Sequence, residues 1–288
     1  MSEIYVSTGA FKSKDIEWIL KSAKENNIKN IELSSGLKYN SKTIDIVLKN
    51  KDDFNFIVHN YFPSPKYPFV LNLASIDKSI IEKSMELCKN AIDLSVELGA
   101  EFYSLHCGFT FNSTGEELGN ESQLALKRVA FDDAYNSFIA NLKELCEYAR
   151  NKNIKLAIEN NVLAKFAVKC GKDMYIGVDT ADFKQIFNDI IDDNLYMLLD
   201  LAHAKVSDTF LKFDIYTMVK ELKNKILAVH ISDNDGKRDS NLPISKGSDV
   251  TEIVKLLSNR HIVLESYNLE PKEIKSQVKL LEEILNDK

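Results

Sequence analysis

The stretch YMLLDLAHAKV (residues 196–206) predicts a buried strand that ends in polar residues. Four apolar residues, 196–199, come first, and then Asp200 and His203 follow. A short apolar run of this kind is typical of a strand in a parallel sheet, which is covered on both faces. A carboxylate and an imidazole at its end raise the question of whether other strands of this chain end in the same way.

The rest of the chain alternates short apolar runs with segments of helical periodicity. Strands are predicted at residues 3–7, 30–34, 54–58, 101–106, 154–159, 195–200, 226–231 and 262–266. Helices are predicted at residues 13–26, 41–50, 76–98, 122–152, 180–191, 213–224, 249–258 and 271–286. Gly99 is expected to end the helix at 76–98. Eight alternating strands and helices with no flexible linker predict one (β/α)8 TIM barrel domain over residues 1–288, of class α/β.

Composition and charge restrict the class of protein. Of the 288 residues, 44% are apolar and 28% are charged, as in ordinary globular proteins. The net charge of −6 argues against nucleic acid as the partner, because phosphate backbones are bound by basic surfaces. The sequence has no apolar run near the ~20 residues of a membrane span, no secretory pattern and no CxxC motif. We therefore expect a cytoplasmic protein with no membrane contact, and the sequence leaves a homo-oligomer open.

Chemically active side chains recur at the carboxyl ends of the predicted strands. They are His59, His106, Glu159, Asp200, His230 and Glu265. Strands five to eight are neighbours in a closed barrel, so the last four side chains are expected to converge. Three buried carboxylates repel one another unless a cation neutralises them. Three oxygen ligands and one imidazole suit one divalent metal ion such as Mn²⁺, Zn²⁺, Co²⁺ or Mg²⁺.

A plainer interpretation exists for each of these residues taken singly. A lone histidine near a strand end is usually a hydrogen-bonded core residue, and a lone carboxylate often caps a helix. Asp233 and Asp239 lie in a polar loop, where a solvated carboxylate is equally expected. His261 begins the eighth strand and should face the opposite end of the barrel.

These segments resemble the xylose isomerase-like TIM barrel superfamily, which includes sugar isomerases and epimerases and endonuclease IV. The resemblance covers almost the whole chain. It rests on LHCGF (105–109), AIENN (157–161), LLDLAHA (198–204), VHISDNDGKRD (229–239) and VLES (263–266). It implies that one divalent metal is bound by the residues matching its motif, which are Glu159, Asp200, His230 and Glu265. It also implies that His203 contacts the substrate or a further metal.

The family has two branches that this chain matches in part. The endonuclease IV branch binds three zinc ions with additional histidines, which His59, His106 and His203 match. Its third zinc also needs a D-x-H pair, and here Asp239 is followed by Asn241 in place of the histidine, so we expect no third site.

The isomerase branch is matched with two departures. Ketose 3-epimerases usually carry a second acid soon after the glutamate of strand five, and residues 160–167 contain none. A basic residue is also expected after the histidine of strand seven, and Arg238 is a displaced candidate. A typical ketohexose is therefore not the expected substrate.

The sequence thus predicts a metal-dependent isomerase or epimerase of a sugar, sugar phosphate or cyclitol, acting through an enediolate. Glu159 and Glu265 are expected to transfer the proton next to the carbonyl, and the metal to stabilise the charged oxygen. Contacts to substrate or a second metal are expected from His59, His106, His203, Asp233, Arg238 and Asp239. One alternative is an AP endonuclease that hydrolyses phosphodiester bonds at abasic sites in DNA. Another is a barrel retained as a binding protein.

The two longest predicted loops, residues 59–75 and 107–121, follow strands three and four and are expected to cover the active face of the barrel. The first of them contains four aromatic residues, Tyr61, Phe62, Tyr67 and Phe69. These rings either cover a sugar or simply pack the loop.

Overall fold

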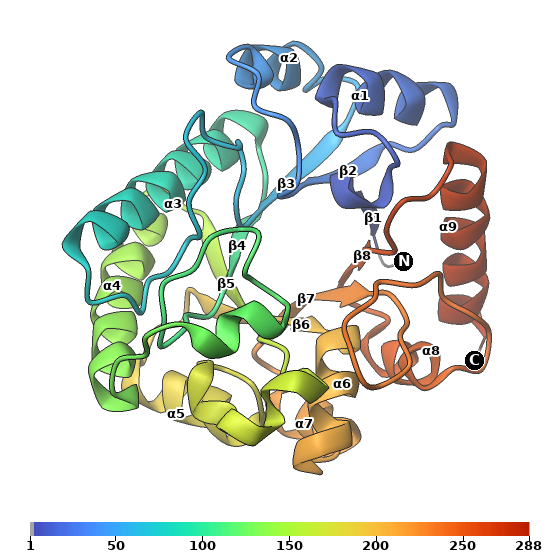
Figure 1. Ribbon diagram of the computed structural model, residues 1–288. Coiled ribbons are helices and arrows are strands. Elements are labelled where there is room, and N and C mark those ends of the chain that lie inside the picture. The colour runs from blue at the N-terminus through green and yellow to red at the C-terminus, as the bar shows by residue number, and fades with distance from the viewer. Residues whose placement is uncertain (1–2, 288) are drawn as a thin grey trace.

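The eight predicted strands form a closed parallel barrel in the computed structural model, which describes residues 3–287 (Figure 1). The strands are β1 (Ile4–Ser7), β2 (Asn30–Leu33), β3 (Asn55–His59), β4 (Phe102–His106), β5 (Lys155–Glu159), β6 (Leu195–Asp200), β7 (Ile226–Ile231) and β8 (His261–Leu264). Each strand pairs with the next, and β8 closes the barrel on β1, with Tyr5 opposite Val263. The predicted (β/α)8 fold is therefore confirmed, and the strand boundaries agree with the prediction within two residues.

Helices surround the barrel on its outside (Figure 1). They are α1 (Ile16–Glu25), α2 (Thr43–Lys49), α3 (Lys78–Leu98), α4 (Phe131–Asn151), α5 (Thr180–Asp189), α6 (Leu201–Leu211), α7 (Ile215–Leu222), α8 (Asp249–Val254) and α9 (Pro271–Asn286). Short 3₁₀ turns are η1 (Thr8–Ala10), η2 (Glu121–Ala125), η3 (Lys165–Cys170), η4 (Lys172–Met174) and η5 (Lys255–Leu257). Within residues 3–287, no helix has both the length and the apolarity needed to cross a bilayer.

Helix α3 begins and ends at residues that the sequence indicates. The Asp77 carboxylate accepts hydrogen bonds from the backbone N–H groups of Ser79 and Ile80, which have no partner inside the helix. Gly99 ends the helix in the left-handed conformation, with φ of 67°. The prediction for Gly99 is therefore confirmed.

Two helices differ from the prediction. The pattern at 122–152 predicts one helix, but α4 begins only at Phe131, because Val129 N–H donates to Thr110 C=O and holds the preceding segment against the loop after β4. Helix α6 is not predicted at all. Its residues 201–204, 206 and 207 are all buried and a narrow strip at Thr209 is exposed, so its sequence lacks the usual periodicity.

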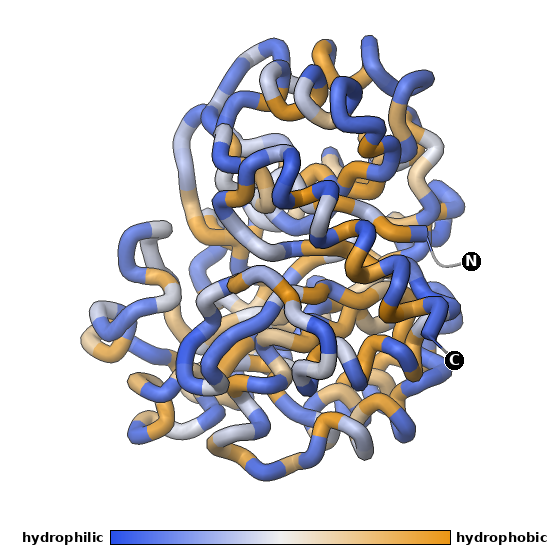
Figure 2. The backbone as a smooth tube through the Cα atoms, turned by 90° about the vertical axis from the view of Figure 1, so that its right-hand side faces the viewer, coloured by the Kyte–Doolittle hydropathy of each residue, from blue (hydrophilic) through white to orange (hydrophobic). Residues whose placement is uncertain are grey.

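The apolar core has three parts. Side chains that fill the barrel come from all but one of its strands: Tyr5, Ile57, Phe102, Ala157, Leu198, Ala228 and Val263. A larger layer lies between the strands and the helices. Figure 2 shows hydrophobic and hydrophilic stretches alternating along the chain, as expected for helices with one face on a barrel. A third cluster lies in the loops after β4 and β5, and it contains Phe109, Phe111, Leu163, Ala167, Met174, Tyr175 and Val178.

Candidate metal centre

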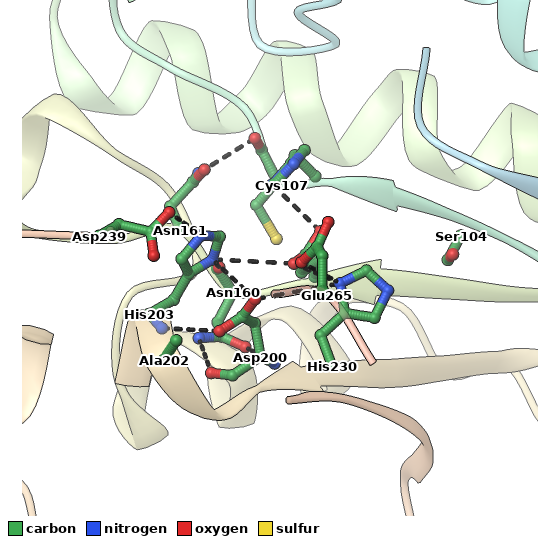
Figure 3. Close-up of polar contacts among 12 residues, drawn as sticks. Ser104, Cys107, Asn160, Asn161, Asp200, Ala202, His203, His230, Asp239 and Glu265 are labelled. Carbon is green, nitrogen blue, oxygen red and sulfur yellow. Dashed lines mark hydrogen bonds and ion pairs between the residues drawn. The ribbon is translucent and has the colours of Figure 1, made fainter. Parts of the chain in front are cut away.

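Four side chains converge at the carboxyl end of the barrel, from the ends of β5, β6 and β7 and from the residue after β8. They are Glu159, Asp200, His230 and Glu265, and one ligand atom of each lies within 4.8 Å of the others. The Nδ1 atom of His230 is 2.9 Å from Glu265 Oε2 and 3.3 Å from Glu159 Oε1. Figure 3 shows Asp200, His230 and Glu265 pointing toward one another. All four side chains are buried.

The electrostatics of this group suit a bound cation. Burial, opposed by His203 and helped by the nearby carboxylates, raises the pKa of Asp200 to about 8. Burial also raises the pKa of Glu159 and Glu265, but neighbouring imidazoles hold both pKa values below the ordinary value. The Oδ2 atom of Asp200 and the Nδ1 atom of His230 are buried without a hydrogen-bond partner. Three carboxylates and one imidazole with unsatisfied atoms fit a divalent metal ion.

Asp200 uses its two carboxylate oxygens differently. Its Oδ1 atom accepts a hydrogen bond of 2.7 Å from the backbone N–H of His203, and so caps the first turn of α6. Its Oδ2 atom lies 3.9 Å from His230 Nδ1. The capping interaction therefore fixes the carboxylate with the other oxygen turned into the centre.

Glu32 in β2 is a site residue that the strand-end pattern does not reveal. Its Oε2 atom lies 2.8 Å from His230 Nε2, and both side chains are fully buried. Because a carboxylate accepts, His230 donates its Nε2–H to Glu32, which leaves Nδ1 facing the other carboxylates. The only signal in the sequence is the charged residue inside the apolar strand NIEL.

A second group lies on the other side of Glu159. The Oε2 atom of Glu159 is 3.2 Å from His59 Nε2 and 3.3 Å from His106 Nδ1, and the three residues have ligand atoms within 4.8 Å of one another. His59 Nδ1 is 2.9 Å from Ser104 Oγ. Burial lowers the pKa of His106 to about 4, so its ring is neutral and has a lone pair to offer. Glu159 thus faces two candidate ligand groups, one with each oxygen.

The residues that correspond to the third zinc group of the endonuclease IV branch are His203, Asp239 and Asn241. His203 Nε2 lies 3.2 Å from Asp239 Oδ2, and His203 Nδ1 donates to the Asn160 carbonyl at 2.8 Å. Asn241 directs its amide to the carbonyl of Glu265 at 3.4 Å. Within residues 3–287, His203 and Asp239 belong to no group of three potential metal ligands. Burial lowers the pKa of His203, but the carboxylates of Asp200 and Asp239 outweigh it and raise that pKa well above the ordinary value.

A cavity of about 610 Å³ opens onto these residues. The predicted site residues that line it are His59, His106, Glu159, His203, Arg238, Asp239 and Glu265. Arg238 makes no ion pair with any residue that the structure describes. Tyr267, which the sequence analysis does not single out, lines the cavity and donates its hydroxyl to Glu265 Oε1 at 3.3 Å.

Two residues considered in the sequence analysis, Asp233 and His261, lie apart from the cavity. Asp233 does not line it, because its Oδ1 atom accepts from Lys205 at 2.6 Å and from the backbone N–H of Asn234. The structure therefore gives Asp233 the structural contacts of a loop carboxylate. His261, at the start of β8, is 3.1 Å from Glu101 at the other end of the barrel, as expected.

Of the four aromatic residues in the loop after β3, two line the cavity and two do not. Tyr61 and Phe69 lie along the cavity, with their rings 5.4 Å apart. Phe62 is fully buried in the core, and Tyr67 is 77% exposed. The loop therefore combines packing with a contribution to the cavity wall.

Comparison with known proteins gives a consistent result. A family model described as "Xylose isomerase-like TIM barrel" matches residues 20–284. The protein MJ1311 of Methanocaldococcus jannaschii, named as uncharacterized, is 25% identical over 258 residues, which cover 84% of this chain and 74% of MJ1311.

Two solved structures have the same fold. A D-tagatose 3-epimerase-like protein is 21% identical, with a TM-score of 0.74 and coverage of 99% of this chain and 98% of its own. The D-psicose 3-epimerase of Clostridium cellulolyticum H10, solved with D-tagatose, is 10% identical, with a TM-score of 0.69 and coverage of 98% and 99%.

Proposed function

The chain belongs to the xylose isomerase-like TIM barrel family, and from this premise we propose that it is a divalent-metal-dependent isomerase or epimerase of a sugar-like polyol. The observation that carries the proposal is the convergence of Glu159, Asp200, His230 and Glu265, of which Glu159 and Glu265 line the cavity. The names of the two solved structures, both of them ketose 3-epimerases or similar to one, favour the same class of substrate.

The four converging residues would hold one Mn²⁺, Zn²⁺, Co²⁺ or Mg²⁺ ion. When bound, such an ion stabilises the negative charge that develops on the carbonyl oxygen as the neighbouring carbon loses its proton. Asp200 is oriented for binding by its capping hydrogen bond, and His230 by its hydrogen bond to Glu32. These fixed orientations reduce the cost of assembling the ligands.

Proton transfer would fall to Glu159 and Glu265, which both line the cavity and come from different strands. A carboxylate on each side of the substrate lets one remove the proton and the other return it to the opposite face, which gives an epimer. Return to the neighbouring carbon gives an isomer. His106, His203 and Asp239 also line the cavity and would hydrogen-bond the hydroxyls of the substrate.

Proton exchange tests this proposal directly. The metal-loaded protein should catalyse exchange of deuterium from D₂O into a ketose or cyclitol ketone of a substrate panel, and Glu159→Gln or Glu265→Gln should abolish it. Asp233→Asn is the matched control, because Asp233 lies outside the cavity lining, and it should keep the activity. Exchange that survives both glutamine variants would show that these residues are not the acid and base.

An AP endonuclease is the second candidate, and the grouping of His59, His106 and Glu159 favours it. Against it, Arg238 is the one arginine and no lysine is present among the cavity-lining residues that the structure describes, and Asn241 does not supply the ligand of a third zinc site. We expect one or two metal ions per chain by elemental analysis and no cleavage of an abasic duplex. Three zinc ions per chain with cleavage would overturn the isomerase assignment.

A further inference from the structure

The part of the cavity beyond the candidate metal ligands is lined mainly by apolar side chains. Its side chains come from the loops after β3, β4 and β5 and include Val70, Phe109, Leu118, Phe166 and Tyr175. We call this part the apolar chamber. Phe109 and Tyr175 belong to the buried cluster of these loops, and Val70 and Phe166 pack against it. The chamber is thus supported by a small core of its own and exists before any substrate binds.

The polar groups of the chamber are largely engaged by the protein itself. The amide of Gln123 donates to the Tyr175 hydroxyl and accepts from the backbone N–H of Gly119 at 3.0 Å. The Tyr61 hydroxyl accepts from Phe69 N–H at 2.7 Å. The amide nitrogen of Asn161 donates to three backbone carbonyls. Few groups therefore remain to hydrogen-bond the many hydroxyls of a sugar.

Charge is also distributed unevenly along the cavity. Among the described lining residues, none of those at 60–71, 109–123 or 161–175 is charged. The charged ones are Glu159, His203, Arg238, Asp239 and Glu265, which lie at or after the ends of β5, β6, β7 and β8. A phosphate or another anion would find no cation in the chamber.

We propose that the substrate carries a neutral apolar group, of the size of an aromatic ring, which occupies the apolar chamber while its polyol end faces the metal ligands. This inference rests on the proposed function for the polyol end only. Cavities of about 300–1,000 Å³ hold drug-sized ligands, and the volume of about 610 Å³ leaves room for a group beyond a single sugar. The substrate class is thus a sugar or cyclitol joined to an aglycone or a similar apolar substituent.

Hydroxamates provide a test, because they bind divalent metals through two oxygens. Affinities of acetohydroxamate, phenylacetohydroxamate and 4-phenylbutyrohydroxamate for the metal-loaded protein are measured by calorimetry. We expect at least one phenyl compound to bind about tenfold or more tightly than acetohydroxamate, because burying a ring removes apolar surface from water. Phe166→Ser and Leu118→Asp should each remove most of this gain without changing the affinity for acetohydroxamate.

The controls separate this inference from the proposed function. Tyr216→Ser removes an exposed aromatic residue of α7 that does not line the cavity, and it should leave the gain intact. Three results would contradict the proposal that the chamber binds an apolar group. They are equal affinities for the three compounds, no binding of any of them, and a gain in affinity that neither chamber variant changes. Equal binding of acetohydroxamate to metal-loaded and metal-free protein would instead count against the metal centre, while the difference between compounds still reports on the chamber.

Discussion

Glu32 illustrates how a residue outside the strand-end pattern can control the site. It lies on β2 but reaches His230 on β7, and the 2.8 Å contact between two fully buried side chains sets which imidazole nitrogen is free. A histidine whose second nitrogen donates to a carboxylate is both oriented and made more basic. The ligand set therefore depends on a fifth side chain.

The substitution Glu32→Gln should weaken metal binding by about 10–100-fold, the range typical for partners of metal-binding histidines. The amide keeps the shape and one acceptor but loses the charge. Competition with a chelator measures the affinity, and the absorption spectrum of the Co²⁺ form reports the change at the centre. Glu86→Gln on the exposed face of α3 is the control. An unchanged affinity and spectrum would mean that Glu32 has no positioning role.

Metal binding should release protons, so the apparent affinity should rise with pH between about 6 and 8. Burial raises the pKa of Asp200 to about 8, so below this pH the metal must displace its proton. Burial lowers the pKa of His230, but Glu265, Glu32 and Glu159 outweigh it and raise that pKa, so this ring loses a proton as well. Each released proton costs up to about tenfold in affinity per pH unit. Calorimetry in buffers of different ionisation enthalpy counts the protons, and no dependence on buffer or pH would contradict this expectation.

At the scale of the element, β6 and α6 join with no loop between them. Asp200 ends the strand and caps the helix, so the position of a candidate ligand is set by a secondary-structure boundary. Asp200 is thus both a helix cap and a candidate metal ligand. The loops after β3, β4 and β5 differ from this compact junction, because they form the cavity walls over a core of their own.

The two roles of Asp200 can be separated by a pair of variants. Asp200→Asn keeps a good capping side chain, whereas Asp200→Ala does not, so the alanine variant should be less stable by about 1 kcal/mol in urea unfolding of the metal-free protein. Both variants should bind metal more weakly, because both lose a charged ligand. Equal stability of the two would indicate that the cap contributes little to α6.

At the scale of the whole molecule, closure of the barrel brings distant segments to one point. The four converging residues lie between positions 159 and 265, at the ends of four adjacent strands or directly after them, and Glu32 approaches from β2. A ligand that joins so many strands binds the folded chain and not the unfolded one. Its binding energy therefore adds to the free energy of unfolding.

Removal of metal should lower the melting temperature by several degrees. At a metal concentration of 100 times Kd, binding adds about 2.7 kcal/mol of stability, and about 1 kcal/mol corresponds to about 2–4 °C for a chain of this size. Thermal unfolding after treatment with EDTA, and again after adding back Mn²⁺, Zn²⁺, Co²⁺ or Mg²⁺, measures the change. The Asp200→Asn variant should show little shift, and an equally large shift in that variant would argue for a different site.

The sequence by itself determined the barrel and most of the candidate site. Alternating apolar runs and helical periodicity report which faces are buried, and this information is local. It was enough for eight strands and for the carboxylates and imidazoles at their ends, whereas the departure at Asn241 was visible only through the family resemblance.

Only the tertiary structure decided the rest, because contacts between distant strands depend on barrel closure and register. Three examples join residues that no local pattern relates. Glu32 contacts His230, the two oxygens of Glu159 face two different ligand groups, and Asp233 binds Lys205. Helix α6 has only a weak amphipathic pattern, since most of its first two turns are buried. The apolar chamber, likewise, arises only where three loops meet, and its shape is set by packing between them.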